Sequence, residues 1–235
     1  RTALLPLAAE LDVSFDVEPC AKGLRLTVHG RGCHAAMPET GNNGNTALLR
    51  LLCELPLADC ACTRALAALN AVLPHGDWSG RAAGIAQSDE LSGELTCSFT
   101  QLECDEEKLW GVCDCRVPLC ADDENCRRRF EEKLVPLGFE VSGEMLPGHY
   151  TPAEGEFIQT LLRNYELYSG KKGYCYSMGG GTYVHHIPGG VAFGTEPPDF
   201  DTRMHGANER IPLDELLRCT EIYAGVIASL CGEAE

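Results

Sequence analysis

The sequence predicts an α+β fold in which an antiparallel sheet carries helices on one face. Residues 23–29 alternate apolar and polar side chains, as a half-buried strand does. Residues 94–103 and 108–118 are two further strand-like runs, and the acidic turn at 104–107 between them is typical of a hairpin. Leucines at helical spacing over 45–57 indicate a helix beside these strands. That combination favours an α+β sandwich.

The elements of the first part of the chain follow in order. Residues 2–11 have the pattern of the end of a helix, and the strand 23–29 follows. The helix 45–57 begins behind a Gly/Asn-rich entry. We predict a second helix over 62–72, and then a strand over 81–87 before the hairpin.

The second part of the chain begins with a helix over 125–134 and a strand over 138–145. Pro147-Gly148 is the first plausible domain boundary. After it, residues 156–170 form a helix that ends on a glycine, and residues 213–230 form a helix with an apolar stripe.

The charge of the chain excludes some classes of function. The net charge is −16, from 19 basic and 35 acidic residues, so we expect no nucleic-acid partner. The run Arg127-Arg128-Arg129 is short and has acidic neighbours. No apolar run approaches the ~20 residues of a membrane span, so we expect no membrane insertion. Residues 1–13 lack the pattern of a signal peptide, which favours a cytoplasmic protein.

The 14 cysteines need a separate explanation. In a small secreted chain they would indicate a disulfide framework. Without a signal peptide we expect buried, reduced thiols instead. Several occupy otherwise apolar positions: Cys53, Cys97, Cys113 and Cys219. The pairs Cys60/Cys62 and Cys113/Cys115 are too closely spaced for a zinc knuckle, so we expect no cysteine metal site.

The first candidate site residue is His34, in a run that directly follows a predicted strand. Pro38 and the flanking glycines favour an irregular loop, and small neighbours leave the imidazole room to reach a ligand. Taken alone, a single histidine in a loop is more often structural than functional.

The second candidate is Arg116, at the end of the strand 108–118. A guanidinium there can hold a carboxylate through two hydrogen bonds. An ion pair with Asp114 or Asp122 is the alternative. In a strand, Asp114 and Arg116 share one face and Cys113 and Cys115 share the other.

The third candidate is the run Gly179-Gly180-Gly181-Thr182. Backbone N–H groups of such a run can approach an anion, although tight turns use the same residues. No Gly-Lys-Ser/Thr follows, so this is not a Walker loop.

The fourth candidate is His205, which follows Asp199 and Asp201 in a loop rich in acids. Imidazole among carboxylates suits zinc or manganese. A hydrolytic metal centre needs about three protein ligands per ion, and the sequence offers no second cluster of such ligands.

Together these motifs resemble the M20 family of dinuclear metallopeptidases, in its PepV-like dipeptidase branch. The family's lid motif is similar to residues 30–49, GRGCHAAMPETGNNGNTALL. Its substrate-binding strand is similar to residues 113–118, CDCRVP. Its C-terminal signature is similar to the runs MGGGTY and DTRMHGANERIPLDEL. The order and spacing fit over essentially the whole chain.

The resemblance implies a role for each candidate. His34 would stabilise the scissile carbonyl oxygen as it becomes an oxyanion. Arg116 would pair with the terminal carboxylate of the substrate. Backbone groups of Gly180 and Gly181, together with Thr182, would line the same end of the substrate.

The resemblance also implies two metal ions, zinc or manganese, with His205 as a ligand of one of them. One position departs from the family, because His185, next to His186, stands where many relatives have arginine. The other departure is the family's N-terminal metal-binding half, which has no counterpart in this sequence. A piece with a single expected ligand should not hold the two ions.

The domains and the function follow as expectations. We expect a lid-type sandwich over 1–146 and, over 147–235, the C-terminal part of a zinc-peptidase-like α/β catalytic domain, as a fragment that is inactive alone. The complete protein would hydrolyse dipeptides or small peptides with metal-activated water. The alternatives are a non-catalytic peptide- or partner-binding module and a related aminoacylase or deacylase. Without the missing half, exposed apolar faces of 156–170 and 213–230 would favour self-association or partial disorder.

Overall fold

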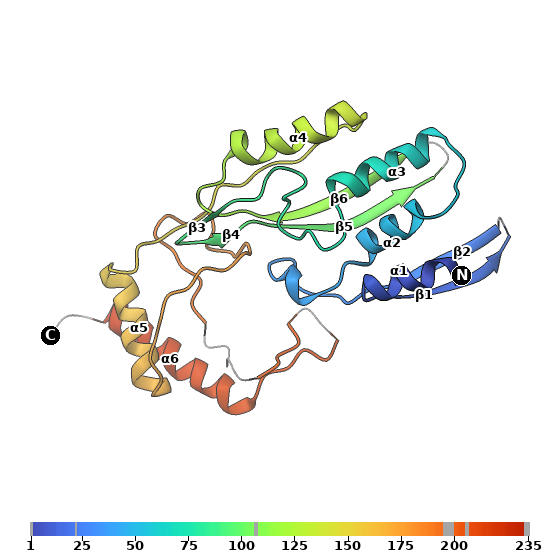
Figure 1. Ribbon diagram of the computed structural model, residues 1–235. Helices are drawn as coiled ribbons and strands as arrows, with labels where there is room; N and C mark the ends of the chain where they lie inside the picture. The colour runs from blue at the N-terminus through green and yellow to red at the C-terminus, as the bar shows by residue number, and fades with distance from the viewer. Residues whose placement is uncertain (1, 22, 106–107, 195–199, 205–206, 233–235) are drawn as a thin grey trace. The chain divides into compact units, whose positions relative to one another are not determined.

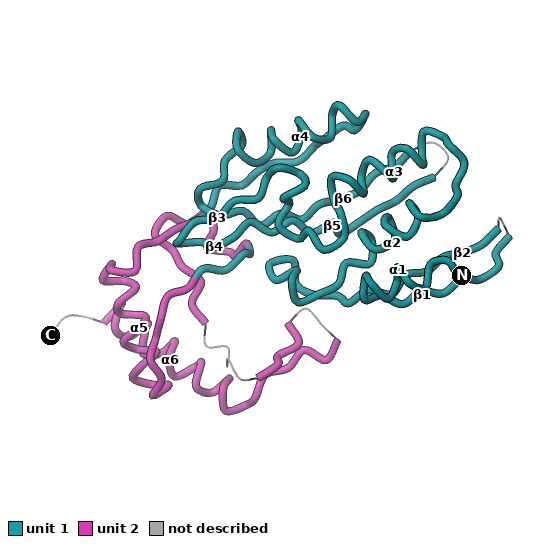
Figure 2. The backbone as a smooth tube through the Cα atoms, viewed as in Figure 1, with its two compact units in different colours: residues 1–148, 177–180 teal, residues 149–176, 181–235 magenta. Residues whose placement is uncertain are grey.

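The computed structural model describes residues 2–21, 23–105, 108–194, 200–204 and 207–232. It confirms the α+β class, with helices and small antiparallel sheets (Figure 1). The chain divides into two compact units (Figure 2). Unit 1 consists of residues 1–148 and 177–180, and unit 2 of residues 149–176 and 181–235. Over the described ranges the strands pair in three separate two-stranded sheets rather than in one continuous sheet.

Unit 1 opens with a short helical segment and a hairpin. Its first elements are η1 (Thr2–Leu4), α1 (Leu5–Glu10), β1 (Ser14–Cys20) and β2 (Gly23–His29). The predicted strand 23–29 is confirmed, whereas its partner β1 was missed because the alternation of Phe15 and Val17 is short and soon meets Pro19. One core cluster joins these elements to the next helix: Leu4, Ala8, Phe15 and Leu51.

The larger part of unit 1 packs two helices against a second hairpin. Its elements are α2 (Gly44–Cys53), α3 (Ala61–Val72), β5 (Thr96–Cys104) and β6 (Leu109–Arg116). The predicted hairpin and the helix 62–72 are confirmed. Helix α2 ends earlier than predicted, because Pro56 disfavours helical geometry at the residue before it. Buried side chains from both helices, from β5 and from the residue that precedes β5 form the main core: Leu49, Leu66, Leu69, Val72, Leu95, Cys97 and Phe99.

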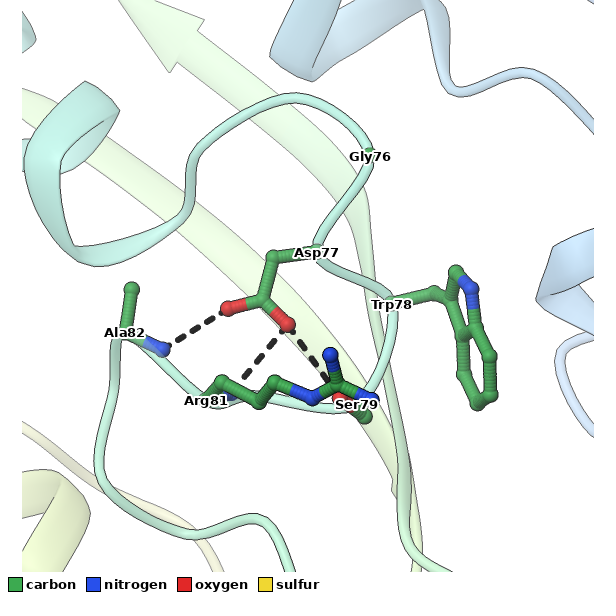
Figure 3. Close-up of a pocket in the computed structure, with 6 residues that line it drawn as sticks. All are labelled: Gly76, Asp77, Trp78, Ser79, Arg81 and Ala82. Atoms are coloured by element: carbon green, nitrogen blue, oxygen red, sulfur yellow. Dashed lines mark hydrogen bonds between the residues drawn. The ribbon is translucent and has the colours of Figure 1, made fainter.

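The strand predicted over 81–87 is wrong, because residues 81–84 form turns and residues 85–87 are irregular. Gly80 and Gly84 have φ angles of +70° and +77°, which a strand does not contain. The carboxylate of Asp77 accepts hydrogen bonds from the N–H groups of Arg81 and Ala82 and from the hydroxyl of Ser79 (Figure 3). The loop is thereby fixed by its own side chain. Two short strands, β3 (Ser88–Asp89) and β4 (Gly93–Glu94), follow it.

The strand predicted over 138–145 is also wrong. The apolar side chains alternate as expected, since Phe139, Val141 and Met145 pack against the main core. The backbone nevertheless has no neighbouring strand with which to pair in the described structure, so it stays irregular. Gly138 and Gly143, with φ angles of +91° and +142°, interrupt the extended conformation.

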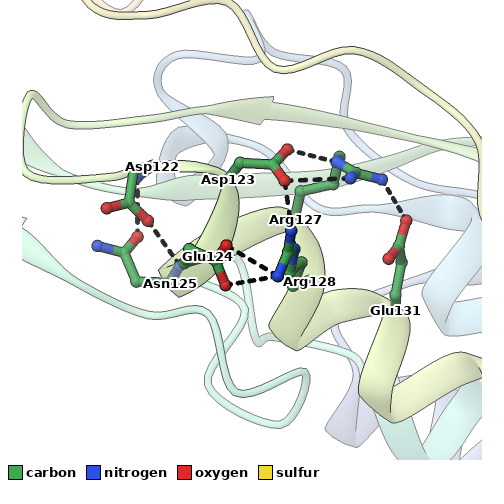
Figure 4. Close-up of polar contacts among 7 residues, drawn as sticks. All are labelled: Asp122, Asp123, Glu124, Asn125, Arg127, Arg128 and Glu131. Atoms are coloured by element: carbon green, nitrogen blue, oxygen red, sulfur yellow. Dashed lines mark hydrogen bonds and ion pairs between the residues drawn. The ribbon is translucent and has the colours of Figure 1, made fainter.

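The predicted helix 125–134 is confirmed as a π-helical turn, η3 (Asp123–Arg127), that continues into α4 (Arg128–Leu134) and η4 (Val135–Leu137). The side chain of Asp122 caps it by accepting the N–H of Asn125 (Figure 4). Arg127 pairs with Asp123 and Glu131, and Arg128 pairs with Glu124. Neighbouring carboxylates thus pair with two of the three arginines of the run.

Unit 2 is built on two helices, α5 (Glu156–Ser169) and α6 (Leu213–Cys231). Both predicted helices are confirmed, and Gly170 ends α5 in the left-handed conformation, with φ +68°. The helices pack through a small core: Ile158, Leu161, Ile222 and Val226. Among the helices of the described structure, none is long and apolar enough to span a membrane.

Candidate substrate-binding site

Three of the sequence motifs meet in unit 1, at the end of the β5–β6 hairpin where β5 begins and β6 ends. Thr96, which lies opposite Arg116 in the strand register, is buried and donates its hydroxyl to the carbonyl of Ala35 at 3.0 Å. This bond holds the His34 loop next to the arginine. A Cβ built on Gly179 would lie 3.1 Å from Cβ of Ala36 and 3.4 Å from Cβ of Arg116, so any larger residue there would have to displace its neighbours by a few tenths of an ångström.

Arg116 is aligned by its neighbour on the same face of β6. Its Nε and Nη2 donate to the two carboxylate oxygens of Asp114 at 2.7 and 2.9 Å. The ion pair with Asp114, given above as the alternative, is therefore present. The side chains are only partly buried, with exposed fractions of 29% and 34%. The third nitrogen, Nη1, lies on the side of Gly180, at 3.9 Å from a Cβ built there.

His34 is held in one tautomer by its own loop. The N–H of Ala36 donates to Nδ1 of the imidazole at 3.1 Å, so the neutral ring carries its proton on Nε2. In this tautomer Nε2 is a hydrogen-bond donor. The ring is half-buried.

The glycine run is divided between the two units. The N–H of Gly180 donates to the carbonyl of Met178 at 2.9 Å, which makes a tight turn, the alternative considered for this run. Gly181 and Thr182 belong to unit 2, where the carbonyl of Thr182 accepts the N–H of His185 at 3.1 Å. The structure thus brings Gly179 and Gly180, but not the next two residues, into the unit that holds Arg116.

The predicted metal ligand His205 lies outside the described residues. Elsewhere in unit 2, the ring of His185 lies 5.9 Å from that of His149 and 5.2 Å from that of His186, measured between centroids. No group of three or more His, Cys, Asp or Glu side chains among the described residues could hold a metal ion. This part of the chain therefore does not fit a metal ion by itself.

Comparison with known proteins places these observations in a family. Residues 20–119, which include His34 and Arg116, match the family model of a peptidase dimerisation domain of the M20 class. A Beta-Ala-Xaa dipeptidase of Lactobacillus delbrueckii subsp. lactis is 30% identical over 227 residues, which cover 96% of this chain and 47% of that protein. Two proteins of Staphylococcus aureus, from strains USA300 and COL, are 33% identical over 213 residues, or 89% of this chain and 45% of theirs, and their names provisionally describe them as dipeptidases.

The chain belongs to the M20 peptidase family. It spans about half the length of the relatives it matches.

Two asparagines in the run 30–49 of this M20 chain, Asn43 and Asn45, hold its structure together. The side-chain amides of Asn43 and Asn45 both donate to the carbonyl of Phe99, at 2.9 and 3.2 Å. They fix the start of α2 against β5, and with it the loop that carries His34. The motif could be found in the sequence, but the partner on β5 could not.

Sequence reasoning missed Thr96 as a residue that positions the site. A threonine in a strand has no distinctive spacing, and its contact with Ala35 joins residues 61 positions apart. Asp114 could be found, since side chains two apart on a strand share a face.

The cysteines of the M20 chain lie outside disulfide bonds in the described structure, but most of them are not buried. Only Cys97 and Cys126 are classed as buried, whereas Cys53 is exposed and Cys219 half-buried. The prediction of buried thiols is therefore wrong for the majority. Cys53 is the last residue of α2, and its apolar neighbours in the sequence do not reveal that it is exposed there.

A shallow hollow of about 380 Å³ lies at the loop 76–82 (Figure 3). Its one carboxylate, Asp77, is occupied with the hydrogen bonds that hold the loop. None of the residues that line this hollow belongs to the three motifs, so it is a poor candidate for the site of an M20 peptidase.

Proposed function

We propose that the complete protein is a peptidase that hydrolyses dipeptides, and that this chain supplies part of its substrate-binding site. The observation that carries the proposal is the meeting of the His34 loop, Arg116 and Gly179 at one end of the β5–β6 hairpin. The family membership supports it, because the relatives above carry dipeptidase names.

Arg116 would bind the terminal carboxylate of a dipeptide. Asp114 holds the Nε and Nη2 edge, which fixes the plane of the guanidinium. The Nη1 side of the guanidinium, next to Gly180, would then donate a hydrogen bond to the substrate carboxylate. A prealigned guanidinium loses less conformational entropy on binding, so the pair with Asp114 helps recognition rather than competing with it.

His34 would donate from Nε2 to the carbonyl oxygen of the scissile bond. The hydrogen bond from Ala36 to Nδ1 selects the tautomer that this role needs. A donor placed where negative charge develops stabilises the transition state more than the ground state. In a dipeptide the scissile carbonyl is close to the terminal carboxylate, which suits a histidine and an arginine held in one unit.

The domain assignment belongs to the proposal too. Residues 1–146 would form the lid domain, and residues 147–235 the last part of the catalytic domain. The match of residues 20–119 to a dimerisation domain supports the first assignment and suggests that the complete protein self-associates. The division between compact units next to Gly148 is compatible with both.

Metal dependence, with two zinc ions or manganese and His205 as one ligand, is likewise proposed for the complete protein. A bound metal would activate the attacking water. The described residues do not by themselves fit a metal ion. The proposed roles of His34 and Arg116 rest on the hydrogen bonds that their own side chains make.

The proposal is tested on the full-length protein with a dipeptide and its C-terminal amide. Wild type should prefer the free carboxylate, and Arg116→Ala should lose most of that preference through a higher KM. Replacing His34 by Ala should lower kcat by about 10²- to 10³-fold, as loss of one oxyanion donor does. Arg81→Ala removes an exposed arginine from the loop 76–82 and serves as the control.

An unchanged dipeptidase activity in the His34→Ala, Arg116→Ala double variant would reject the proposal. Faster cleavage of N-acyl amino acids than of dipeptides would favour a deacylase. Binding of dipeptides without turnover would favour the non-catalytic module.

A further inference from the structure

Two thiols from distant parts of the sequence lie in contact in unit 1. Cys62 is in the first turn of α3, and Cys104 is the last residue of β5. Their Sγ atoms are 3.1 Å apart although the residues are 42 positions apart in the chain. A disulfide bond is about 2.05 Å long, so the two sulfurs need to approach by only about 1 Å to be bonded.

We propose that Cys62 and Cys104 are a reversible disulfide-forming site that reacts with low-molecular-weight disulfides. The site is separate from the proposed peptidase function, because both cysteines lie at the turn end of the β5–β6 hairpin. Arg116 and the His34 loop lie at the other end, beside Thr96.

Accessibility distinguishes this pair from the other close thiols of unit 1. Cys104 is exposed and Cys62 is half-buried, so a small disulfide can reach them. Cys97 and Cys115 also face each other, in the register of the hairpin. However, Cys97 is only 4% exposed. Contact with Cys113, and then burial, raises the pKa of Cys97, while contact with Cys97, and then burial, raises the pKa of Cys115. Both thiols therefore keep their protons at neutral pH and are poor nucleophiles, and Cys97 is also shielded from solvent.

The local electrostatics give the pair an order of reaction. Burial, followed by the contact with Cys62, raises the pKa of Cys104 to about 11, so Cys104 keeps its proton at neutral pH. Cys62, in the first turn of α3, is therefore the sulfur that attacks first.

The chemistry is a thiol–disulfide exchange in two steps. The Cys62 thiolate attacks one sulfur of the small disulfide RSSR, which forms a mixed disulfide and releases RS⁻. Cys104 then loses its proton and attacks Sγ of Cys62, which releases the second RS⁻. In total, two protein thiols are oxidised to one disulfide, RSSR is reduced to two RSH, and the two protons pass to the leaving thiolates.

Cys60 is the rival nucleophile. It caps α3, and the hydrogen bond from the backbone N–H of Thr63 lowers the pKa of its thiol. Its side chain accepts that bond as the cap of the helix, and its sulfur also lies 3.6 Å from the hydroxyl of Thr63. The cap keeps the Cys60 sulfur turned to the helix terminus, whereas the Cys62 sulfur contacts Cys104.

The experiment treats the 235-residue chain with oxidised glutathione at neutral pH and counts free thiols. We expect two of the 14 thiols to be lost without a bound glutathione, and both to return with a dithiol reductant. Trypsin with a protease that cuts after acidic residues releases residues 60–64 and 104–105 as separate peptides, which should be found cross-linked. The variants Cys62→Ser and Cys104→Ser should each abolish the cross-link, and Cys60→Ser should retain it.

A thermal measurement makes the result independent of peptide mapping. Oxidation should raise the unfolding midpoint of wild type and of the Cys60→Ser chain, but not of Cys62→Ala or Cys104→Ala. A cross-link through Cys60, a cross-link between Cys97 and Cys115, a stable glutathione adduct on Cys62, or no loss of thiols would each overturn the proposal.

Discussion

At the scale of single residues, Asp89 joins two segments of unit 1 through one carboxylate. Its oxygens accept hydrogen bonds from the N–H groups of Leu91 and Ser92, from the hydroxyl of Ser92 and from the N–H of Cys120. These bonds, with that of Ser92 the largest contribution, lower the pKa of Asp89 to about 2. Cys120 follows the strand that ends at Arg116, so the carboxylate also steadies the chain behind the candidate site.

This carboxylate predicts a pH dependence of stability. An aspartate in an unfolded chain has a pKa of about 3.9, so its lower pKa in the folded state stabilises the fold above that pH. The contribution should be lost as the pH falls from about 4 towards 2. The urea midpoint of wild type should therefore fall more steeply over this range than that of Asp89→Asn. Glu90→Gln, a change at the neighbouring exposed acid, is the control, and equal slopes for wild type and Asp89→Asn would contradict the prediction.

Some residues of the candidate site could be predicted from the sequence, but their contacts could not. His34 and Arg116 could be selected, because each lies in a motif with distinctive residue types. The tautomer of His34 depends on a bond to Ala36 within its own loop, which no spacing reveals. For Arg116, the sequence predicts an ion pair with Asp114 as one alternative to substrate binding. The ion pair is present, and it is compatible with the proposed binding of a carboxylate.

At the scale of elements, the start of α2 depends on Asn43. Its side-chain oxygen accepts the N–H groups of Asn45 and Thr46, which caps the helix. Its amide donates to the carbonyl of Phe99 on β5, which attaches the helix to the hairpin. One side chain thus begins the helix and also sets where it lies.

Replacing Asn43 by Ala should destabilise the chain by about 2 kcal/mol, of which about 1 comes from the lost cap and about 1 from the lost bond to Phe99. Asn43→Asp keeps the cap acceptor and loses only the donor, so its loss should be about half as large. Urea unfolding at neutral pH measures both. Equal losses for the two variants would show that the cap contributes nothing.

The elements that were predicted correctly are those whose signal is local. The helices at 62–72, 156–170 and 213–230 have apolar side chains at helical spacing, and each packs on one face. The failures at 81–87 and 138–145 arose because a strand needs a partner, and alternation along one segment says nothing about pairing. In the first segment the Asp77 hydrogen bonds favour turns instead.

At the scale of the whole molecule, unit 2 leaves one side of α6 exposed. The apolar residues on that side recur at helical spacing, and each is at least 42% exposed: Leu213, Leu216, Leu217, Tyr223, Ile227 and Leu230. A stripe of this kind favours contact with another apolar surface.

We therefore expect this chain to self-associate as its concentration rises, and sedimentation velocity measures it. Leu217→Lys and Ile227→Lys should each weaken the association, because they place a charge within the stripe. Glu221→Lys changes a residue of α6 that is already polar and exposed, and should have a smaller effect. A monomer at every concentration would contradict the expectation.

The short segment 177–180 has a consequence for how this protein can be divided. It belongs to unit 1, while the chain on both sides of it belongs to unit 2, so the backbone passes between the units after residues 148, 176 and 180. A chain cut after Gly148 would keep Arg116 but lose Gly179, the residue packed against it. The two units are thus interleaved along the sequence. Neither is encoded by one uninterrupted segment that could be exchanged or deleted as a whole.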